Sequence, residues 1–364
     1  MRVVFRTDSS EQIGTGHVWR CLTLADYLTT QGDVCTFICR DLPGNIIKQI
    51  ERRKHDVISL PPPPSNGKKY LSATEQWLEM KTGKDAGQTA AELGKIGDIS
   101  WLVIDHYGIG IEWEQIINTK CGLDRIFVID DLANREHKCD LLLDQNLNSD
   151  DDRYRDYLPD SCKVLLGPPY ALLRPEFIET RQNISERTGD VERVLIFFGG
   201  VDADNATAKT MQAFLKFADN NIHLDVIVGT ANPHYNSIRE IARELPHCDI
   251  YKNVDDMAEF MAEADLAIGA GGTTAWERAW LGLPSLIIIL AENQRAGTEA
   301  LAKSGAAWNL GLINELSSDD IRASVDYASK SPEEMKKMSR AAMRIFGPGK
   351  KSGVEKVFSA MRSI

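Results

Sequence analysis

The sequence predicts an α/β protein built from two Rossmann-like, doubly wound domains. The chain has 364 residues, which is more than one ordinary hydrophobic core accommodates. Short apolar runs rich in Val, Ile and Leu alternate with amphipathic helical patterns, as in parallel sheets that helices cover on both faces. This alternation occurs twice, and a polar stretch poor in large apolar residues, 179–192, separates the two series. We therefore expect a first domain over 1–180, a linker over 181–192 and a second domain over 193–364.

Short apolar runs mark the expected strands. In the first half they cover 2–7, 34–39, 57–60, 101–105, 126–130, 141–144 and 163–166. In the second half they cover 194–198, 224–228, 249–252, 266–269, 285–290 and 307–310. The sequence leaves open the role of the polar, weakly helical segment 61–97 and the place of a last helix near 354–362. Two successive arrays of this kind predict two sheets that face a central cleft, with a ligand at the carboxyl ends of the strands.

The composition excludes several classes of partner. The chain has 42 Lys and Arg against 53 Asp and Glu, a net charge of −11, so we expect neither nucleic acid nor a membrane as partner. Its longest apolar stretch, 284–290, is too short to span a membrane, and no signal peptide opens the chain, so a cytoplasmic location is expected. The seven cysteines contain no Cys-x-x-Cys pair and predict reduced thiols. We expect a monomer with no metal and no other cofactor.

Four glycine-rich turns follow predicted strands: Gly14-Thr15-Gly16, His106-Tyr107-Gly108, Gly199-Gly200, and the run from Gly269 to Thr274. Glycines at such places let backbone amides approach a phosphate, and the positive pole of a following helix favours an anion. The phosphate-binding pattern Gly-x-x-x-x-Gly-Lys-Ser/Thr does not occur in the chain. The first turn has Trp19 where the dinucleotide fingerprint requires its third glycine, so an NAD site is disfavoured.

His17 stands where the first glycine turn becomes a helix. Apolar residues repeat at helical spacing from here, namely Val18, Cys21, Leu22, Ala25 and Leu28. This spacing places Arg20, Thr23 and Asp26 on the opposite, polar side. A histidine at a helix N-terminus is kept neutral by the helix dipole and can accept a proton, while the simpler alternative is a packing histidine in a tight turn.

The most informative stretch is DLAIGAGGTTAWERAWLGLPSLIIILAENQ, residues 265–294. A helix is expected to open there on a turn suited to a diphosphate, formed by Gly271, Gly272, Thr273 and Thr274. Glu277 lies one turn further along, where its carboxylate can bind the two hydroxyls of a ribose. The alternative is that Glu277 is a surface residue on an exposed helix face.

Four further side chains near the turns are candidate substrate contacts: Asp8, His106, Tyr107 and Asp202. For Asp8 the competing role is a hydrogen bond that fixes the turn. For Asp105-His106, which ends a strand, a cap or turn role competes with contact to a sugar. The acidic pairs at 130–131 and 202–204 lack histidine partners and are weak evidence for a metal.

Several motifs taken together resemble a known family. The helix after Gly271, with Glu277 and then Gly-Leu-Pro, is similar to the sugar-nucleotide half of MurG-like enzymes of the GT-B fold. RTDSSEQIGTGHVWRCLTLA, VIDHYGI, GPPYALLRPEF and ENQ occur in order between residue 1 and about residue 310. With these motifs the chain resembles the PseG family, the UDP-2,4-diacetamido-2,4,6-trideoxy-β-L-altropyranose hydrolases of pseudaminic acid biosynthesis.

The resemblance implies a GT-B fold and a metal-independent hydrolysis in which water attacks the anomeric carbon, with C–O cleavage and inversion. It implies that His17 is the catalytic base, that Glu277 binds the nucleotide, and that Arg174 and Asn293 are further contacts. General-base help of this kind contributes roughly 10²–10⁴-fold. The amides of the turn after residue 270 would stabilise the leaving UDP.

Two alternatives remain from the sequence. The first is an inverting GT-B glycosyltransferase that uses a UDP-sugar donor, although no apolar and basic docking patch for a lipid acceptor is evident. The second is a non-catalytic protein that binds a UDP-sugar.

Overall fold

The computed structural model describes residues 1–364 apart from 65–70, 148–149, 151, 218–220, 230, 253, 255 and 348–350. Contacts divide the chain into two units. Unit 1 comprises Met1–Leu172 and Lys351–Ile364, and unit 2 comprises Leu173–Lys350. No described helix combines the length and the apolar character that crossing a bilayer requires.

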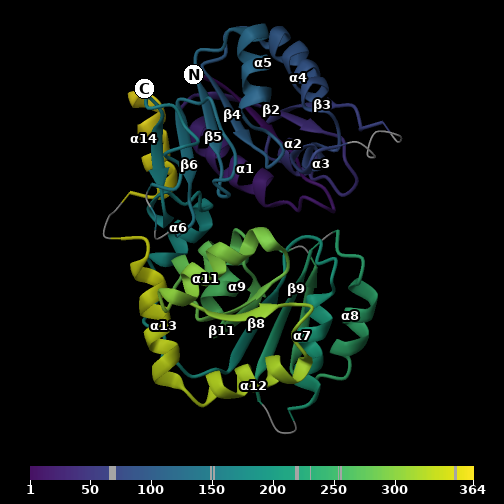
Figure 1. The fold of residues 1–364 in the computed structure, drawn as a ribbon. Coiled ribbons are helices and arrows are strands. Elements are labelled where there is room, and N and C mark those ends of the chain that lie inside the picture. The colour runs from purple at the N-terminus through teal and green to yellow at the C-terminus, as the bar shows by residue number, and fades with distance from the viewer. Residues whose placement is uncertain are drawn as a thin grey trace. The chain divides into compact units, whose positions relative to one another are not determined.

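Unit 1 is built on a seven-stranded parallel sheet with the strand order β3-β2-β1-β4-β5-β6-β7 (Figure 1). The seven strands predicted in the first half are confirmed, with ends that shift by a residue. Their bounds are β1 Arg2–Thr7, β2 Val34–Arg40, β3 Asp56–Leu60, β4 Trp101–Asp105, β5 Ile126–Ile129, β6 Leu141–Asp144 and β7 Lys163–Leu166.

Helices cover both faces of this sheet because successive strand residues point to opposite sides. Val3 and Phe5 of β1 pack on the side of α1 (Gly16–Thr30) and α2 (Ile47–Arg52). Val4 packs on the other side, against three helices. These are α3 (Ala73–Leu78), α4 (Thr82–Ile96) and α5 (Ile111–Cys121), so the segment 61–97 supplies part of this layer (Figure 1).

The last helix, α14 (Gly353–Ser363), whose place the sequence left open, belongs to unit 1, although the expected bounds of the second domain, 193–364, included it. It packs beside α1 with Val357 and Met361 in the core of that face. Gly353 lies so close to Ala171 that an added Cβ would stand 2.1 Å from the Ala171 carbonyl oxygen. Arg362 forms an ion pair with Asp33 at 3.0 Å. The helix returns because its apolar stripe needs a partner, and unit 1 supplies one.

Unit 2 is built on a six-stranded parallel sheet with the order β10-β9-β8-β11-β12-β13. The strands are β8 Arg193–Phe197, β9 His223–Val228, β10 Cys248–Lys252, β11 Leu266–Ala270, β12 Ser285–Ile289 and β13 Trp308–Leu312. The six strands predicted in the second half are confirmed.

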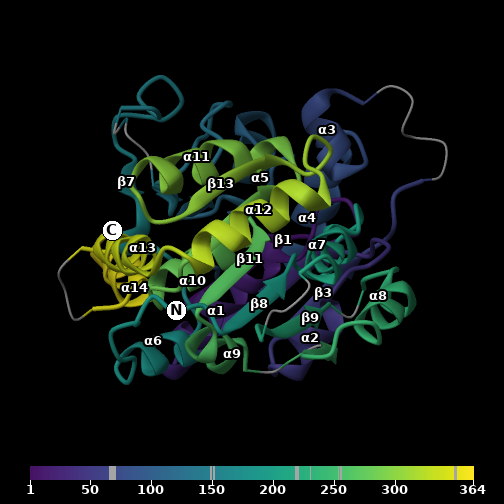
Figure 2. The same cartoon turned by 90° about the horizontal axis from the view of Figure 1, so that it is seen from below.

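The helices of unit 2 also cover both faces of its sheet. On one face lie α7 (Ala206–Leu215), α8 (Tyr235–Ala242), α12 (Ser318–Ser329) and α13 (Pro332–Arg344), with α12 packed along α7 (Figure 2). On the other lie α6 (Pro175–Arg181) and α9 (Met257–Glu263). The remaining helices are α10 (Thr274–Trp280) and α11 (Arg295–Lys303).

The boundary between the units falls at residues 172/173, so the predicted linker over 181–192 is part of unit 2. Arg181 donates to the Trp280 carbonyl oxygen at 2.6 Å, and Arg187 donates to that of Met261 at 2.9 Å. Polar side chains in this segment therefore reach backbone acceptors of unit 2.

Each sheet reverses its strand order at one place, which is where ligands bind in open α/β sheets. In unit 1 the reversal lies between β1 and β4, and in unit 2 it lies between β8 and β11. The glycine turns predicted from the sequence follow these four strands.

Candidate active site

The turn after β1, which contains Gly14 and Gly16, reverses direction at Gly14. Gly14 has a φ of +80°, which glycine adopts at little cost. Its amide donates to the Ser10 carbonyl oxygen at 2.8 Å, and the Ser10 hydroxyl accepts from the Ile13 amide. α1 then begins at Gly16, so His17 lies in its first turn, as predicted.

His17 is paired with Asp105 at the end of β4. The His17 Nδ1 lies 2.5 Å from the Asp105 Oδ1, and both side chains are buried. Burial raises the pKa of Asp105, but the Arg20 guanidinium and His17 outweigh it, so the pKa lies well below its usual range. An ionised Asp105 accepts the Nδ1 proton, which leaves Nε2 of a neutral ring free to accept one.

Arg20 holds the Asp105 carboxylate in place. Its Nε and Nη2 lie 2.5 and 2.7 Å from the two oxygens of Asp105, and its Nη1 lies 2.9 Å from Asp131. Arg20, which helical spacing separates from the apolar stripe of α1, is only 4% exposed, so this side of the helix is covered at Arg20 as well. The sequence did not single out Arg20 as a candidate site residue; its spacing of three from His17 was the available signal.

Tyr107 packs edge-on against His17, with 4.5 Å between the ring centroids. Its other neighbour is Trp77, at 5.3 Å. Burial and the nearby Asp131 raise the pKa of the Tyr107 hydroxyl well above its usual value, so the phenol stays neutral. The half-buried Tyr107 thus adjoins the His17 ring, and its contact with a substrate stays a prediction.

Asp8 and His106 lie beneath the site and are enclosed by unit 1. Asp8 is fully buried, accepts from the Arg40 amide at 2.6 Å and pairs with Arg6 at 2.6 Å. The His106 Nδ1 accepts from the Gly108 amide at 2.9 Å, and its Nε2 lies 3.3 Å from Asp8. Both residues therefore take the structural roles that the sequence left open as alternatives to substrate contact.

A row of carboxylates follows β5 and β6. Asp130 pairs with Arg135 at 2.7 Å, and Asp144 with Arg153 at 3.1 Å. Burial and the nearby Asp131 raise the pKa of Asp144 to about 7. Arginines therefore hold these carboxylates. The acidic pair at 130–131, which in the sequence was weak evidence for a metal, is among them.

In unit 2 the turn after β8 contains Gly199, which has a φ of +94°, and Gly200. Asp202 stands two residues after Gly200. Its two carboxylate oxygens accept from the amides of Ala206 and Thr207 at 2.8 and 3.0 Å. Asp202 is 5% exposed, and burial raises its pKa. It therefore caps α7, although the sequence offered it as a candidate ligand contact.

The turn after β11 requires glycine for packing. A Cβ on Gly269 would stand 2.4 Å from the Phe197 carbonyl oxygen, and one on Gly271 would stand 2.1 Å from the Thr298 hydroxyl. Gly272 and Thr273 complete the turn, and α10 begins at Thr274.

Glu277 and Arg174, which the sequence selected separately, are brought together. The Arg174 Nε donates to the Glu277 Oε1 at 3.1 Å, and both belong to unit 2. Glu277 is 9% exposed, so the alternative of a surface residue is wrong, and burial raises its pKa. Its Oε2 is buried without a hydrogen-bond partner among the described residues. A buried carboxylate oxygen without a donor is a candidate ligand contact.

Asn293 is exposed on a short 3₁₀ helix, Glu292–Gln294, that lies against the turn after β11. A Cβ added to Gly271 would stand 3.4 Å from the Cβ of Gln294, so the 3₁₀ helix lies close to the turn. The Gln294 Oε1 accepts a hydrogen bond from the Leu290 amide. Asn293 is thus presented next to the predicted diphosphate turn.

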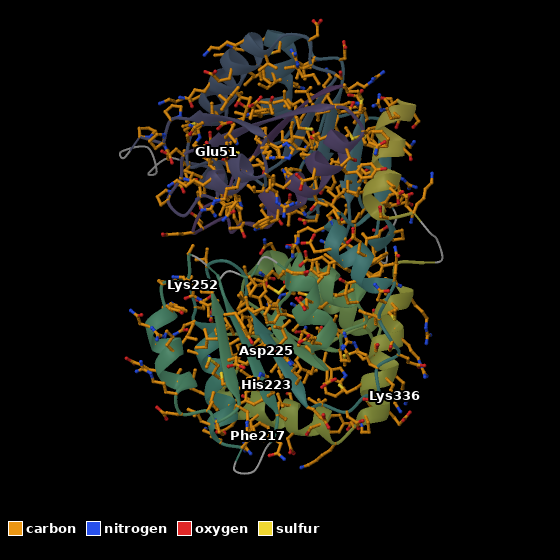
Figure 3. The ribbon with its side chains drawn as sticks, turned by 180° about the vertical axis from the view of Figure 1, so that it is seen from behind. Glu51, Phe217, His223, Asp225, Lys252 and Lys336 are labelled. Atoms are coloured by element: carbon orange, nitrogen blue, oxygen red, sulfur yellow. The ribbon has the colours of Figure 1, made fainter. Side chains whose placement is uncertain are left out.

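One group of the described residues has metal-ligand geometry: His223, Asp225 and Asp249. Arg193 donates to both oxygens of Asp225, so an ion-pair network explains the group without a metal. His223 opens β9 and Asp249 lies near the start of β10, whereas Lys252 ends β10 (Figure 3). The group therefore lies at the opposite end of the sheet from the glycine turns.

The two doubly wound parallel sheets, with glycine turns at their switch points, define the GT-B class of fold. The solved structure of MurG from Acinetobacter baumannii matches with a TM-score of 0.64 and 15% identity, over 100% of this chain and 99% of that one. The predicted fold class is confirmed.

Residues 193–357 match the model of the glycosyltransferase family 28 C-terminal domain. The chain thus has the GT-B fold, and this stretch of it is similar to the C-terminal domain of glycosyltransferase family 28. It is 28% identical over 305 residues to a Campylobacter jejuni protein named UDP-2,4-diacetamido-2,4,6-trideoxy-beta-L-altropyranose hydrolase, covering 84% of this chain and 97% of that protein. It is 26% identical over 324 residues to an uncharacterised protein of Methanocaldococcus jannaschii, where 86% of this chain spans 61% of the relative's length.

Proposed function

We propose that the protein is a nucleotide-sugar hydrolase that converts UDP-2,4-diacetamido-2,4,6-trideoxy-β-L-altropyranose and water to UDP and 2,4-diacetamido-2,4,6-trideoxy-L-altrose. The observation that carries this assignment is the His17–Asp105 pair at the switch point of unit 1. The Campylobacter jejuni relative, which bears this activity in its name and aligns over nearly its full length, supports the choice of substrate.

The chemistry follows from the tautomer that Asp105 selects. His17 Nε2 takes a proton from water while the water oxygen attacks the anomeric carbon from the face opposite to the UDP. The bond between that carbon and the phosphate oxygen breaks, and its electron pair leaves with UDP. Asp105, fixed by Arg20, stabilises the imidazolium that forms and keeps the ring oriented.

Unit 2 would hold the nucleotide. The free Oε2 of Glu277 is suited to the ribose hydroxyls, and the glycine turns after β8 and β11 bring backbone amides to the diphosphate. These amides and the Thr273 and Thr274 residues would offset the charge that develops on the departing UDP. The resemblance implies that no metal takes part, so activity is expected to survive treatment with a chelator.

The decisive experiment incubates the full chain with the UDP-sugar and no acceptor and follows UDP release. We expect turnover, with label from ¹⁸O-water in the sugar product and none in UDP. Label in UDP would contradict C–O cleavage.

His17→Ala and Asp105→Asn should each lower kcat by about 10²–10⁴-fold, since the first removes the base and the second loses the required tautomer. His55→Ala is a matched control, because the His55 Nε2 pairs with Asp26 at 2.7 Å in unit 1, away from the turn. A His17→Ala protein that keeps most of its turnover would refute the assignment.

An inverting glycosyltransferase is the second candidate, and the matched family 28 domain favours it. A transferase would release UDP only when an acceptor is added. Measuring UDP release with and without candidate acceptors separates the two functions.

A further inference from the structure

Arg278 is a buried cation without a carboxylate partner among the residues that the structure describes. It lies on α10, is 1% exposed, and forms no salt bridge with any residue that the structure describes. Its Nη2 donates to the Ala270 carbonyl oxygen at 2.8 Å and its Nη1 to the Thr274 hydroxyl at 3.3 Å. Its Nε has no hydrogen-bond partner in the described part of the chain. Placing a charge in the interior in this way is costly.

Two other buried arginines of this protein, Arg6 and Arg20, are compensated by carboxylates. Arg6 and Arg20 each contact two carboxylates, which hold their pKa above the usual value against the effect of burial. For Arg278, burial lowers the pKa to about 10, although the neighbouring Glu277 opposes the change. Within the protein itself, the positive charge of Arg278 is therefore left with little compensation.

The guanidinium lies directly beneath the turn after β11. A Cβ on Gly269 would stand 2.8 Å from its Nη1, so glycine is required there partly to admit Arg278. Because Nη1 donates to the Thr274 oxygen, the hydroxyl hydrogen of Thr274 points elsewhere and remains available as a donor. Thr274 is half-buried, so a ligand on the outer side of the turn can reach it.

The helix itself supplies little of the attraction for an anion. α10 has only seven residues, and its first turn contains the acidic Glu277. A diphosphate at this turn therefore needs a fixed positive charge from another source, and Arg278 is positioned to provide it.

We propose that Arg278 is a positioning residue for the diphosphate of the nucleotide: it orients the Thr274 hydroxyl toward a phosphate oxygen and supplies the positive charge beneath the turn. This inference rests on the proposed function, in which unit 2 holds UDP. It assigns to Arg278 the recognition of phosphate charge and not of the base or the ribose.

The test compares calorimetric binding of UDP and of uridine to the full chain. Arg278→Gln keeps an N–H donor for the Ala270 carbonyl but removes the charge. We expect its affinity for UDP to fall by about 10- to 100-fold, as for loss of a hydrogen bond to a charged group, while its affinity for uridine stays within about twofold.

Two further variants examine the link through Thr274. Thr274→Val should weaken UDP binding selectively, and Thr274→Ser should restore it because the hydroxyl returns. The double variant of Arg278→Gln and Thr274→Val should lose less than the product of the two single losses, since both act on one contact.

Arg187→Gln is the matched control in the same unit. Arg187 likewise donates to backbone carbonyls, those of Met261 and Ala264, and burial also lowers its pKa to about 10. Ala264 precedes β11, so Arg187 lies at the opposite end of this strand from the turn. Its loss should change thermal stability but not the ratio of UDP to uridine affinity.

The outcomes separate the two claims. A wild-type protein that binds no UDP overturns the proposed function and this inference with it. Two results overturn the inference alone, provided that the wild type binds UDP. In the first, Arg278→Gln binds UDP as tightly as the wild type does. In the second, its affinities for UDP and for uridine fall by the same factor. Should Arg278→Gln not fold, an unchanged UDP affinity of Thr274→Val overturns the inference, and a selective loss supports it.

Discussion

At the scale of single residues, the pairing of Asp105 with His17 could not be predicted from the sequence. A glycine turn and a helix start, which are local features, made His17 a candidate, and the family resemblance implied that it is the base. Asp105 lies 88 positions away and meets His17 only because β1 and β4 are neighbours in the sheet. Helical spacing placed Arg20 on the face opposite to the apolar stripe, but spacing does not show whether that face is covered.

Glu277 gives a prediction about ribose recognition. If its free Oε2 binds the ribose hydroxyls, the wild type should bind UDP about tenfold more tightly than 2′-deoxy-UDP, and Glu277→Gln should reduce this preference to about two- or threefold. Titration calorimetry with both nucleotides measures the ratio. Glu176→Gln is the control, since Glu176 also pairs with Arg174, at 2.9 Å, and should leave the preference intact. An undiminished preference in Glu277→Gln would exclude the ribose role.

Asp144 gives a prediction about pH and stability. Its pKa rises from 3.8 to about 7 on folding, so its protonated form is favoured in the folded protein. The stability that this group contributes is complete below pH 3.8 and is lost as the pH rises toward 7. Asp144→Asn should therefore stabilise the protein more at pH 8 than at pH 5, by about 3 kcal/mol, because about two units of the pKa shift fall in this range and one unit is worth about 1.4 kcal/mol. Urea unfolding at the two pH values measures the difference, and an equal effect at both would contradict the raised pKa.

At the scale of elements, the strands were predictable and the last helix was not. A parallel strand covered on both faces gives a short continuous apolar run, which is distinctive in β1 or β12. The stripe of α14 shows only that the helix needs an apolar partner, and either unit could have supplied one. Gly353 fits against the backbone of Ala171, a contact that no local pattern indicates.

This contact yields a prediction on thermal stability. Gly353→Ala should destabilise unit 1 by about 1–3 kcal/mol, because its Cβ would meet backbone atoms that cannot move aside. The control is Gly94→Ala in α4, where nothing lies within 4 Å of the added Cβ and a more stable helix is expected. Thermal unfolding of the two variants tests the pair, and equal effects would contradict the close contact.

At the scale of the whole molecule, the chain passes between the units twice, at residues 172/173 and 350/351. The polar composition of 181–192 predicted a linker, since exposed segments and linkers share that composition. Arg181 and Arg187 show the difference, because each contacts backbone carbonyls of unit 2. Composition reports the exposure of a segment, whereas a boundary depends on contacts between distant residues.

Ending the chain at Lys351 should therefore weaken the unit that carries the N-terminus. Removal of α14 takes away Val357 and Met361, and it uncovers the apolar residues of α1 that lie in the same core. We expect faster hydrogen exchange in β1 and α1, with little change in β8 and β11. Faster exchange in both units alike would contradict the assignment of α14 to unit 1.

The return of α14 also has a consequence for biosynthesis. A nascent chain can complete the second lobe while the first still lacks its closing segment, so the lobe made first is expected to finish folding last. This reverses the usual N-to-C order of domain maturation, and until α14 has been synthesised it leaves an apolar surface open to chaperones.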